Sequence, residues 1–319
     1  MKCLLTACSL ALLGTGGCDP RGLGRPNPDF LVIGHRGAPE ILAENTVDSF
    51  DVAVALGANA LETDVCITED GVFVLWHDRD PDGPVAFARQ SGAEGLAYIP
   101  LVPPIGSEWR RPVDQLTLDE LREHYGYGNL TGRRNERAVI PTLDDLFDFA
   151  RSAPELQAIY VDVKLSTAEL DAARDLVGRL ALAASEDDSL EHVRFFAMSP
   201  ERTIVDAMEA ARREPEAPEL GRDALRVIWD FEGLGALAGA SSADLRDTSS
   251  GLVPNVPWSA FKREVARLVA ARENGRLDSV TVWTFDEPRQ LAELLYYSVD
   301  GVMTNDPGAL YGIWQDTLD

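Results

Sequence analysis

The chain reads FLVIGHRGAP at residues 30–39, an apolar run that ends at a histidine and an arginine. A continuous apolar run without alternating polar residues predicts a strand buried on both faces, as in a parallel sheet. Side chains that directly follow such a strand lie at its carboxyl end, where α/β proteins place their sites. We therefore predict a buried first strand followed by His35, with Arg36 beside it as a group able to bind an oxyanion through two hydrogen bonds.

The same pattern recurs along the chain. Amphipathic stretches of helical period lie between many of the apolar runs, which are Phe30–Gly34, Ala60–Val65, Val72–Trp76, Ala158–Val163, Val193–Met198, Leu225–Trp229, Ser279–Trp283 and Asp300–Met303. Continuous apolar strands separated by helices predict an α/β fold with a helix-covered parallel sheet. Eight strands in about 290 residues fit a (β/α)8 TIM barrel. A doubly wound open sheet is the alternative, but no GxGxxG motif follows the first strand.

Two connections depart from a simple alternation of strand and helix. Residues 66–71 are too short for a helical crossover, and Thr68-Glu69-Asp70-Gly71 resembles a tight turn, so the second and third runs are expected to form a hairpin. Residues 79–139 are rich in Pro and Gly, and a connection this long is usually functional or a small subdomain. We predict a barrel domain over residues 30–319 with an inserted subdomain at 79–139, after the third strand.

Acidic residues occupy strand positions that normally hold apolar side chains. Glu62 and Asp64 are two residues apart in LETDV, so they point to the same face of a strand. Unpaired carboxylates inside a barrel are costly, and a divalent cation relieves that cost; an outward, solvated face is the alternative. Asp162 and Lys164 are spaced alike at the end of another run, where an internal ion pair is the alternative. In a hairpin, the return strand would bring His77 beside Glu62.

Taken together, these segments resemble the glycerophosphodiester phosphodiesterase family. The resemblance covers most of residues 30–312 and rests on His35-Arg36-Gly37, Glu44-Asn45-Thr46, Gly57-Ala58, Glu62-x-Asp64-Val65, Thr68-x-Asp70-Gly71, Val74-x-x-His77-Asp78, Ile140-Pro141-Thr142-Leu143, Val282-Trp283-Thr284 and Asp300 to Pro307. The family resembled has a (β/α)8 barrel with an insertion after the His-Asp strand. This chain departs from its pattern at Ala43, where the family has proline, and at Asp162, where it has glutamate.

The resemblance implies a role for each matching residue. His35 and His77 match the acid–base histidines, while Glu62 and Asp64 match two metal ligands. The third ligand of the family is a glutamate two residues before a lysine; here Asp162 and Lys164 stand in those places. The shorter Asp162 side chain puts the metal affinity of this site in question.

A mechanism follows from these groups. Oxygen ligands alone suit Mg²⁺ or Ca²⁺ and give little reason to expect zinc. The cation, helped by Arg36 and Lys164, would hold a phosphodiester oxygen, while one histidine removes a proton from the attacking oxygen and the other protonates the leaving alkoxide. Trp283, at a strand end, is expected either to wall the glycerol pocket or to be a core aromatic.

The predicted function is metal-dependent hydrolysis of glycerophosphodiesters to glycerol 3-phosphate and an alcohol. One alternative is an enzyme similar to the phospholipase D and sphingomyelinase D toxins, which act on intact phospholipid and share a run much like Gly57 to Asp64; Glu44-Asn45-Thr46 favours the diesterase. The other alternative is a barrel that only binds a phosphorylated ligand or cell-surface polymer, and Asp162 is the sole feature that favours it.

The composition limits the partners of this protein. The 319 residues include 29 Lys and Arg against 53 Asp and Glu, a formal net charge of −24. Non-specific nucleic-acid binding is excluded, because a polyphosphate backbone needs clustered Lys and Arg. An acidic protein that handles a phosphodiester must neutralise it locally, with a metal ion or a few placed cations. A small-molecule phosphodiester is the expected ligand, and no protein partner is indicated.

The first residues resemble a bacterial export signal. Lys2 precedes a mostly apolar run, Cys3–Leu13, which is too short to span a bilayer. Residues 1–17 are predicted to be a signal peptide of the lipoprotein type, with Cys18 as the lipid-modified first residue. Thr15 stands where such signals usually have leucine, so ordinary cleavage and secretion is the alternative. Residues 18–29 read as a flexible tether, and the protein is expected to work outside the cytoplasm, in the periplasm or at the cell surface.

Overall fold

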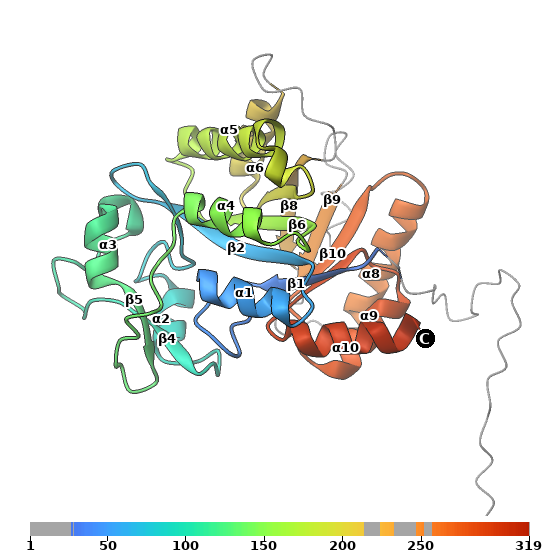
Figure 1. The fold of residues 1–319 in the computed structure, drawn as a ribbon, viewed down its shortest axis with the longest axis horizontal. Coiled ribbons are helices and arrows are strands. Elements are labelled where there is room, and N and C mark those ends of the chain that lie inside the picture. The colour runs from blue at the N-terminus through green and yellow to red at the C-terminus, as the bar shows by residue number, and fades with distance from the viewer. Residues whose placement is uncertain (1–26, 28, 214–223, 233–246, 252–256, 319) are drawn as a thin grey trace, which may run out of the picture.

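Eight parallel strands form a closed ring in the part of the chain that the computed structural model describes, residues 27, 29–213, 224–232, 247–251 and 257–318. Each strand is hydrogen bonded to the next, and β1 pairs with both β2 and β11. The predicted α/β barrel is thereby confirmed (Figure 1). In ring order the strands are β1 (Leu31–His35), β2 (Ala60–Ile67), β6 (Ala158–Val163), β7 (Arg194–Ser199), β8 (Leu225–Glu232), β9 (Asp247–Gly251), β10 (Ser279–Trp283) and β11 (Gly301–Thr304).

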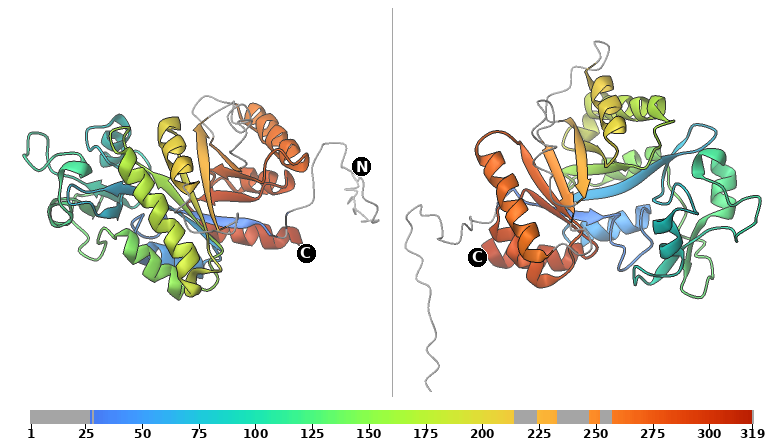
Figure 2. Two further views of the ribbon diagram at one scale, coloured as in Figure 1. Left: turned by 90° about the horizontal axis from the view of Figure 1, so that it is seen from above. Right: turned by 180° about the vertical axis from the view of Figure 1, so that it is seen from behind.

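Helices cover the outside of the ring. Views from above and behind show them around the strands, with α5 and α6 on one side and α8, α9 and α10 on another (Figure 2). The first of these helices directly follows Thr46. The Thr46 side chain caps it by accepting a hydrogen bond from the backbone N–H of Ser49. The covering helices are α1 (Val47–Ala55), α4 (Leu143–Ser152), α5 (Leu170–Glu186), α6 (Arg202–Arg212), α8 (Trp258–Glu273), α9 (Pro288–Tyr296) and α10 (Pro307–Leu318).

Two apolar layers hold the barrel together. The strand residues that face outward, such as Leu61 and Val161, pack against helix residues such as Phe50 and Leu146. A smaller cluster fills the interior of the ring and includes Leu31, Ile33, Ala60, Ala158, Tyr160, Phe196, Met198, Ile228 and Met303. Because successive strand residues alternate between the two faces, the interior layer fixes which later residues also point inward.

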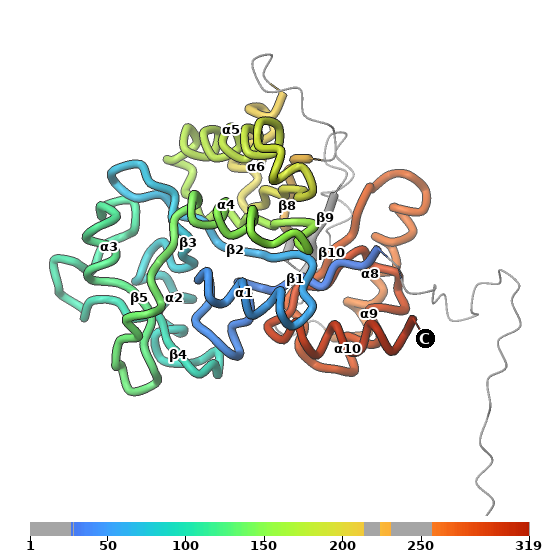
Figure 3. The backbone as a smooth tube through the Cα atoms, viewed as in Figure 1, coloured from blue at the N-terminus to red at the C-terminus, as the bar shows by residue number. Residues whose placement is uncertain are grey.

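A hairpin and an insertion lie beside the ring. β3 (Phe73–Leu75) runs antiparallel to β2, which confirms the predicted hairpin. The chain then forms α2 (Pro84–Gln90), β4 (Tyr98–Leu101), a 3-10 turn at Val113–Gln115, α3 (Leu118–His124) and β5 (Gly126–Asn129), where β4 and β5 make a separate two-stranded sheet. The tube drawing shows this insertion at one side of the barrel, away from α8, α9 and α10 (Figure 3).

The insertion has its own small core. Trp76, which follows β3, is fully buried against Tyr125 and Tyr127 of the insertion. Cys66 and Val74 of the hairpin belong to the same cluster. The hairpin therefore joins the insertion to the barrel.

The set of eight runs counted toward the barrel needs correction at two points. The run Val72–Trp76 belongs to the hairpin and not to the ring. The ring is completed instead by β9, which was not predicted because its sequence, DTSSG, is small and polar and carries no apolar signal.

Some of the sequence predictions concern other parts of the chain. The predicted signal peptide at residues 1–17, Cys18 and all of the predicted tether except Asn27 and Asp29 lie outside the described residues. Among the helices that are described, none combines the length and the apolar character needed to cross a bilayer.

Candidate active site

The strand register brings the predicted site residues together. Ile33 and Ala60 face the barrel interior and are paired across β1 and β2, so the next inward pair along these strands is His35 and Glu62. On the other side of β2, Asp64 is paired with Asp162 of β6 in the same way. The interior is thus apolar at the start of the strands and polar at their carboxyl ends, where barrel active sites lie.

Glu62, Asp64 and Asp162 form a buried acidic cluster. Each offers an oxygen within 4.8 Å of the others, and their exposed fractions are 2%, 1% and 8%. Burial, followed by the neighbouring charge of Asp64, raises the pKa of Glu62 well above its usual range, and burial likewise raises the pKa of Asp162. Burial acts against ionisation of Asp64 too, but Arg36 and further neighbours hold its pKa well below the usual range.

This cluster has the chemistry of a metal site. All its donors are carboxylate oxygens, which hard divalent cations prefer. Asp162 Oδ1 is buried and accepts no hydrogen bond from the described residues, and Asp64 Oδ1, also buried, has only an ion pair with Lys164 Nζ at 3.3 Å. Buried oxygens normally have a partner, so the unpartnered Oδ1 of Asp162 in this cluster fits a cation that supplies it.

Arg36 links the acidic cluster to the loop after β1. Its backbone is in the left-handed region, with φ at 55°, and its amide donates to Glu62 Oε2 over 2.9 Å. Its guanidinium reaches Glu44 Oε2 at 2.9 Å and Asp64 Oδ2 at 3.0 Å. Asn45, also at positive φ, donates to Asp64 Oδ2 over 2.8 Å. The predicted oxyanion-binding guanidinium therefore already contacts carboxylates, and one of its roles is to orient Asp64.

His35 is held in one orientation. Its Nδ1 lies 2.7 Å from Oδ1 of Asn305, whose amide nitrogen and backbone N–H both donate to Asp286. Because Asp286 fixes which end of the amide faces His35, that end is an acceptor and Nδ1 carries the proton. Nε2, with its lone pair, then lies 3.9 Å from Glu62 Oε2. Burial, and next the charge of Arg36, lowers the pKa of His35 to about 4.

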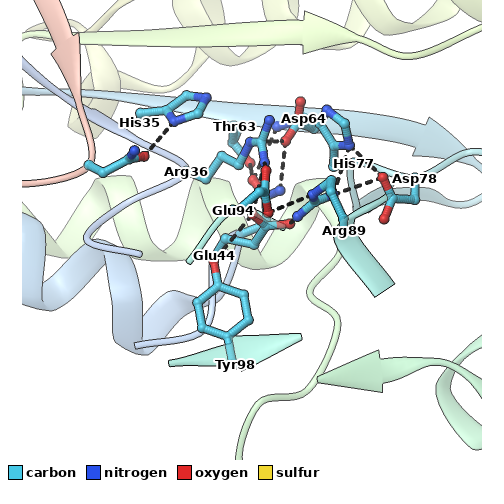
Figure 4. Close-up of polar contacts among 12 residues, drawn as sticks. His35, Arg36, Glu44, Thr63, Asp64, His77, Asp78, Arg89, Glu94 and Tyr98 are labelled. Atoms are coloured by element: carbon cyan, nitrogen blue, oxygen red, sulfur yellow. Dashed lines mark hydrogen bonds and ion pairs between the residues drawn. The ribbon is translucent and has the colours of Figure 1, made fainter. Parts of the chain in front are cut away.

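His77 sits in a second arrangement of this kind. Its Nδ1 lies 2.6 Å from Asp78 Oδ1 and 2.8 Å from an η nitrogen of Arg89. Burial, and then Arg36, lowers the pKa of the imidazole well below its usual range. In Figure 4 the Arg36 side chain lies between the two imidazoles, and Asp64 lies on the His77 side of it.

Lys164 and Trp283 are both placed at this end of the barrel. Lys164 Nζ is 2.5 Å from Asp162 Oδ2 and 3.3 Å from Asp64 Oδ1, so the Asp–Lys ion pair exists and also reaches the acidic cluster. Trp283 ends β10, packs partly buried on the interior cluster and donates through Nε1 to Asp230 over 2.6 Å. Its predicted role in a glycerol pocket stays a prediction.

The sequence predictions missed several residues of the site. Glu44, Asn45, Asp78 and Asn305 stand within the segments that carried the family resemblance, but none was given a chemical role. Arg89 had no signal at all, because it lies in a short helix of the Pro- and Gly-rich connection. All five residues contact the site from loops or from the short insertion helix, and contacts of this kind have no fixed spacing in the sequence.

An α/β barrel with two oriented imidazoles and a buried cluster of three carboxylates at the carboxyl ends of its strands has the groups that an enzyme of acid–base chemistry uses. Comparison with known proteins identifies the family. The model of the glycerophosphoryl diester phosphodiesterase family matches residues 35–309. The chain belongs to this family and is a phosphoric diester hydrolase.

Individual relatives agree with this assignment. A glycerophosphodiester phosphodiesterase of Arabidopsis thaliana is 24% identical over 288 residues, which are 90% of this chain and 74% of that protein. A probable glycerophosphodiester phosphodiesterase of Mycobacterium tuberculosis is 26% identical over 298 residues, covering 88% of this chain and 92% of its own.

Solved structures show the same fold. A structure of a similar putative enzyme from Silicibacter pomeroyi, 23% identical, superposes with a TM-score of 0.66 over 92% of this chain and 95% of its own. A phosphodiesterase of Oleispira antarctica, solved with its product sn-glycerol-3-phosphate, is 16% identical and gives 0.61 over 90% of this chain and 96% of its own.

Proposed function

We propose that this enzyme hydrolyses small glycerophosphodiesters to glycerol 3-phosphate and an alcohol, with Mg²⁺ or Ca²⁺ held by Glu62, Asp64 and Asp162. The observation that carries the proposal is the pair of oriented imidazoles, His35 and His77, beside one acidic cluster. Further support comes from the Oleispira antarctica relative, whose structure holds sn-glycerol-3-phosphate as its product.

The bound cation would supply a positive charge for a phosphoryl oxygen, which is worth several kcal/mol to the transition state. One imidazole accepts the proton of the attacking oxygen as that oxygen bonds to phosphorus. The other donates a proton to the alkoxide oxygen as its bond to phosphorus breaks. Each proton transfer contributes about 10²–10⁴-fold. Lys164, and Arg36 from the loop after β1, add positive charge beside the developing oxyanion.

The tautomer of His35 and the lowered pKa values of both histidines set the form in which the two imidazoles meet the substrate. In His35, Nδ1 donates to Asn305, so the lone pair of Nε2 faces the acidic cluster. Lowered pKa values keep both imidazoles neutral at pH 7, and a neutral imidazole is the form that accepts a proton. Whichever histidine acts as the acid must first gain its proton in the complex with substrate, where a phosphate charge favours it.

The test is release of glycerol 3-phosphate from a panel of diesters that includes glycerophosphocholine. We expect turnover that EDTA abolishes and Mg²⁺ or Ca²⁺ restores. His35→Ala and His77→Ala are expected to lower kcat by about 10²-fold or more, whereas His192→Ala, an exposed histidine away from the site, serves as the control. Full turnover by both His35→Ala and His77→Ala would contradict the proposal.

A parallel assay addresses intact phospholipid as the substrate. Choline release from sphingomyelin vesicles is measured beside that from glycerophosphocholine. The proposal predicts activity on the water-soluble diester only. Activity on the vesicles with none on glycerophosphocholine would favour the phospholipase D-like alternative.

We also propose that the enzyme is exported and anchored through lipidated Cys18, on the strength of the sequence of residues 1–18. Expression with labelled palmitate in a bacterial host, followed by detergent phase partition, tests this. Label in the wild type and none in Cys18→Ala is the expected result. An unlabelled, fully released wild-type protein would favour simple secretion.

A further inference from the structure

Arg89 is a buried cation that the insertion supplies to the active site. It lies near the end of α2, and only 3% of the residue is exposed. Its guanidinium contacts three carboxylates: Asp78 Oδ1 at 2.8 Å, Glu94 Oε2 at 2.8 Å and Oε1 of Glu44. Burying a guanidinium is costly unless it is fully paired, and this one is paired on every side.

One of these contacts determines the state of His77. Asp78 Oδ1 is 2.6 Å from His77 Nδ1, and Arg89 donates to the same oxygen. Arg89 Nη1 also lies 2.8 Å from His77 Nδ1, but the ionised carboxylate is the stronger acceptor for its N–H group. With Asp78 ionised and only 2.6 Å from Nδ1, the proton of the imidazole is favoured on Nδ1, because two lone pairs would otherwise face each other. His77 then presents the lone pair of Nε2, the form that a general base needs.

Arg89 also favours the ionised form of Asp78. Burial raises the pKa of Asp78 to about 6, and the charge of Arg89 is the strongest influence in the opposite direction. Without Arg89 the buried carboxyl would take up a proton more readily. A protonated Asp78 can donate to Nδ1, which would move the imidazole proton to Nε2 and remove the lone pair from the site.

The other end of Arg89 reaches toward the acidic cluster. Glu44 accepts from Arg89 through Oε1 and from Arg36 through Oε2 over 2.9 Å. Arg36 in turn lies 3.0 Å from Asp64 Oδ2. A continuous row of alternating charges therefore runs from Asp78 through Arg89, Glu44 and Arg36 to Asp64, as Figure 4 shows.

We propose that Arg89 is a positioning residue for the reaction, through which the insertion orients His77 by way of Asp78 and supports Arg36 by way of Glu44. This inference rests on the proposed function, since it requires that His77 transfer a proton. It gives the insertion a part in catalysis: the barrel supplies the reacting groups, and α2 supplies the cation that fixes one of them.

The experiment compares Arg89→Met with Arg110→Met. Arg110 is a matched control, because its side chain is also buried in the insertion, 5% exposed, and bonds to Asp82, Pro81, Pro103 and Gln90 without contacting the site residues. We expect Arg89→Met to lower kcat by about 10–100-fold with KM within about twofold, as loss of an orienting partner does. Arg110→Met should lower the melting temperature while leaving kcat within about twofold.

Two further variants keep the test decisive if Arg89→Met folds poorly. Arg89→Lys keeps the charge but cannot bridge several carboxylates, so it should recover part of the lost kcat. Asp78→Asn should lower kcat on its own, and adding Arg89→Lys to it should cost less than in the wild type, because both act on His77. Additive losses, or a kcat for the Arg89 variants equal to that of Arg110→Met, would overturn the inference.

The same assays separate the inference from the proposed function. A wild-type enzyme that turns over no diester, with any metal, contradicts the proposed function. A wild-type enzyme that is active, a His77→Ala variant that is inactive and Arg89 variants that are fully active would contradict only the role of Arg89.

Discussion

Asn305 shows how a single residue can decide the state of a reacting group. Its Oδ1 holds His35 Nδ1 at 2.7 Å, and Asp286 fixes the amide from behind. We predict that Asn305→Ala lowers kcat for glycerophosphodiesters by about 10-fold or more, because the imidazole loses both its orientation and its preferred tautomer. Steady-state kinetics with circular dichroism as a folding check measures this.

A second asparagine provides the control. Asn274 is exposed at the end of α8, where its side chain donates to the backbone of Ala270. Asn274→Ala should leave kcat unchanged. Equal activities of the two variants would show that His35 needs no partner at Nδ1.

The sequence predicted those site residues whose relation is set by strand geometry. Glu62 and Asp64 are two apart on β2, and Lys164 directly follows β6 two residues after Asp162, so the alternation of side chains predicts a common face for each pair. Asn305 and Arg89 could not be assigned in this way. Their contacts with His35 and His77 depend on loop paths across 270 and 12 residues, which no periodicity encodes.

The loop between β1 and α1 is the element on which His35 and Arg36 depend. Gly37 has φ at 94°, and a Cβ added there would lie 2.5 Å from Ser49 Oγ and 2.8 Å from the backbone of the same residue. We predict that Gly37→Ala destabilises the protein by about 1–3 kcal/mol and also lowers kcat, since α1 cannot move without moving the loop. Urea denaturation and turnover measure the two effects.

Gly178 is the opposite case. It lies in α5, and nothing is within 4 Å of an added Cβ. Gly178→Ala should raise the stability by about 0.5–1 kcal/mol without affecting kcat, because alanine lowers the entropy of the unfolded chain. If both substitutions shift the urea midpoint alike, the close contact with Ser49 is not the reason that position 37 requires glycine.

At the level of elements, the strength of the local signal decided what could be predicted. Apolar runs identified seven of the eight strands in the ring, and the short connection at 66–71 correctly indicated the hairpin. β9 was missed because its pairing comes from its neighbours, β8 and β10, rather than from apolar residues of its own. A strand of this kind is specified by the closure of the barrel.

The whole molecule combines a strongly acidic surface with a site that must accept an anion. A formal charge of −24 repels anionic substrates at long range, whereas Arg36, Lys164 and the cation proposed for the acidic cluster would attract the phosphodiester only at close range. Salt shortens the range of the repulsion, since the Debye length falls from about 30 Å at 0.01 M to about 10 Å at 0.1 M ionic strength. Net charge should therefore influence which diesters the enzyme prefers.

Two substrates that differ in head-group charge test this. Glycerophosphocholine is neutral overall, and glycerophosphoglycerol carries one negative charge. With the divalent cation held at a fixed saturating concentration, raising NaCl from about 0.01 to 0.2 M should increase kcat/KM for glycerophosphoglycerol several-fold and change that for glycerophosphocholine little. The neutral substrate is the internal control, because it has the same phosphodiester group and any effect of salt on the fold or on the metal acts on both. A ratio of the two kcat/KM values that stays constant with salt would show that the local charges of the site outweigh those of the remaining surface.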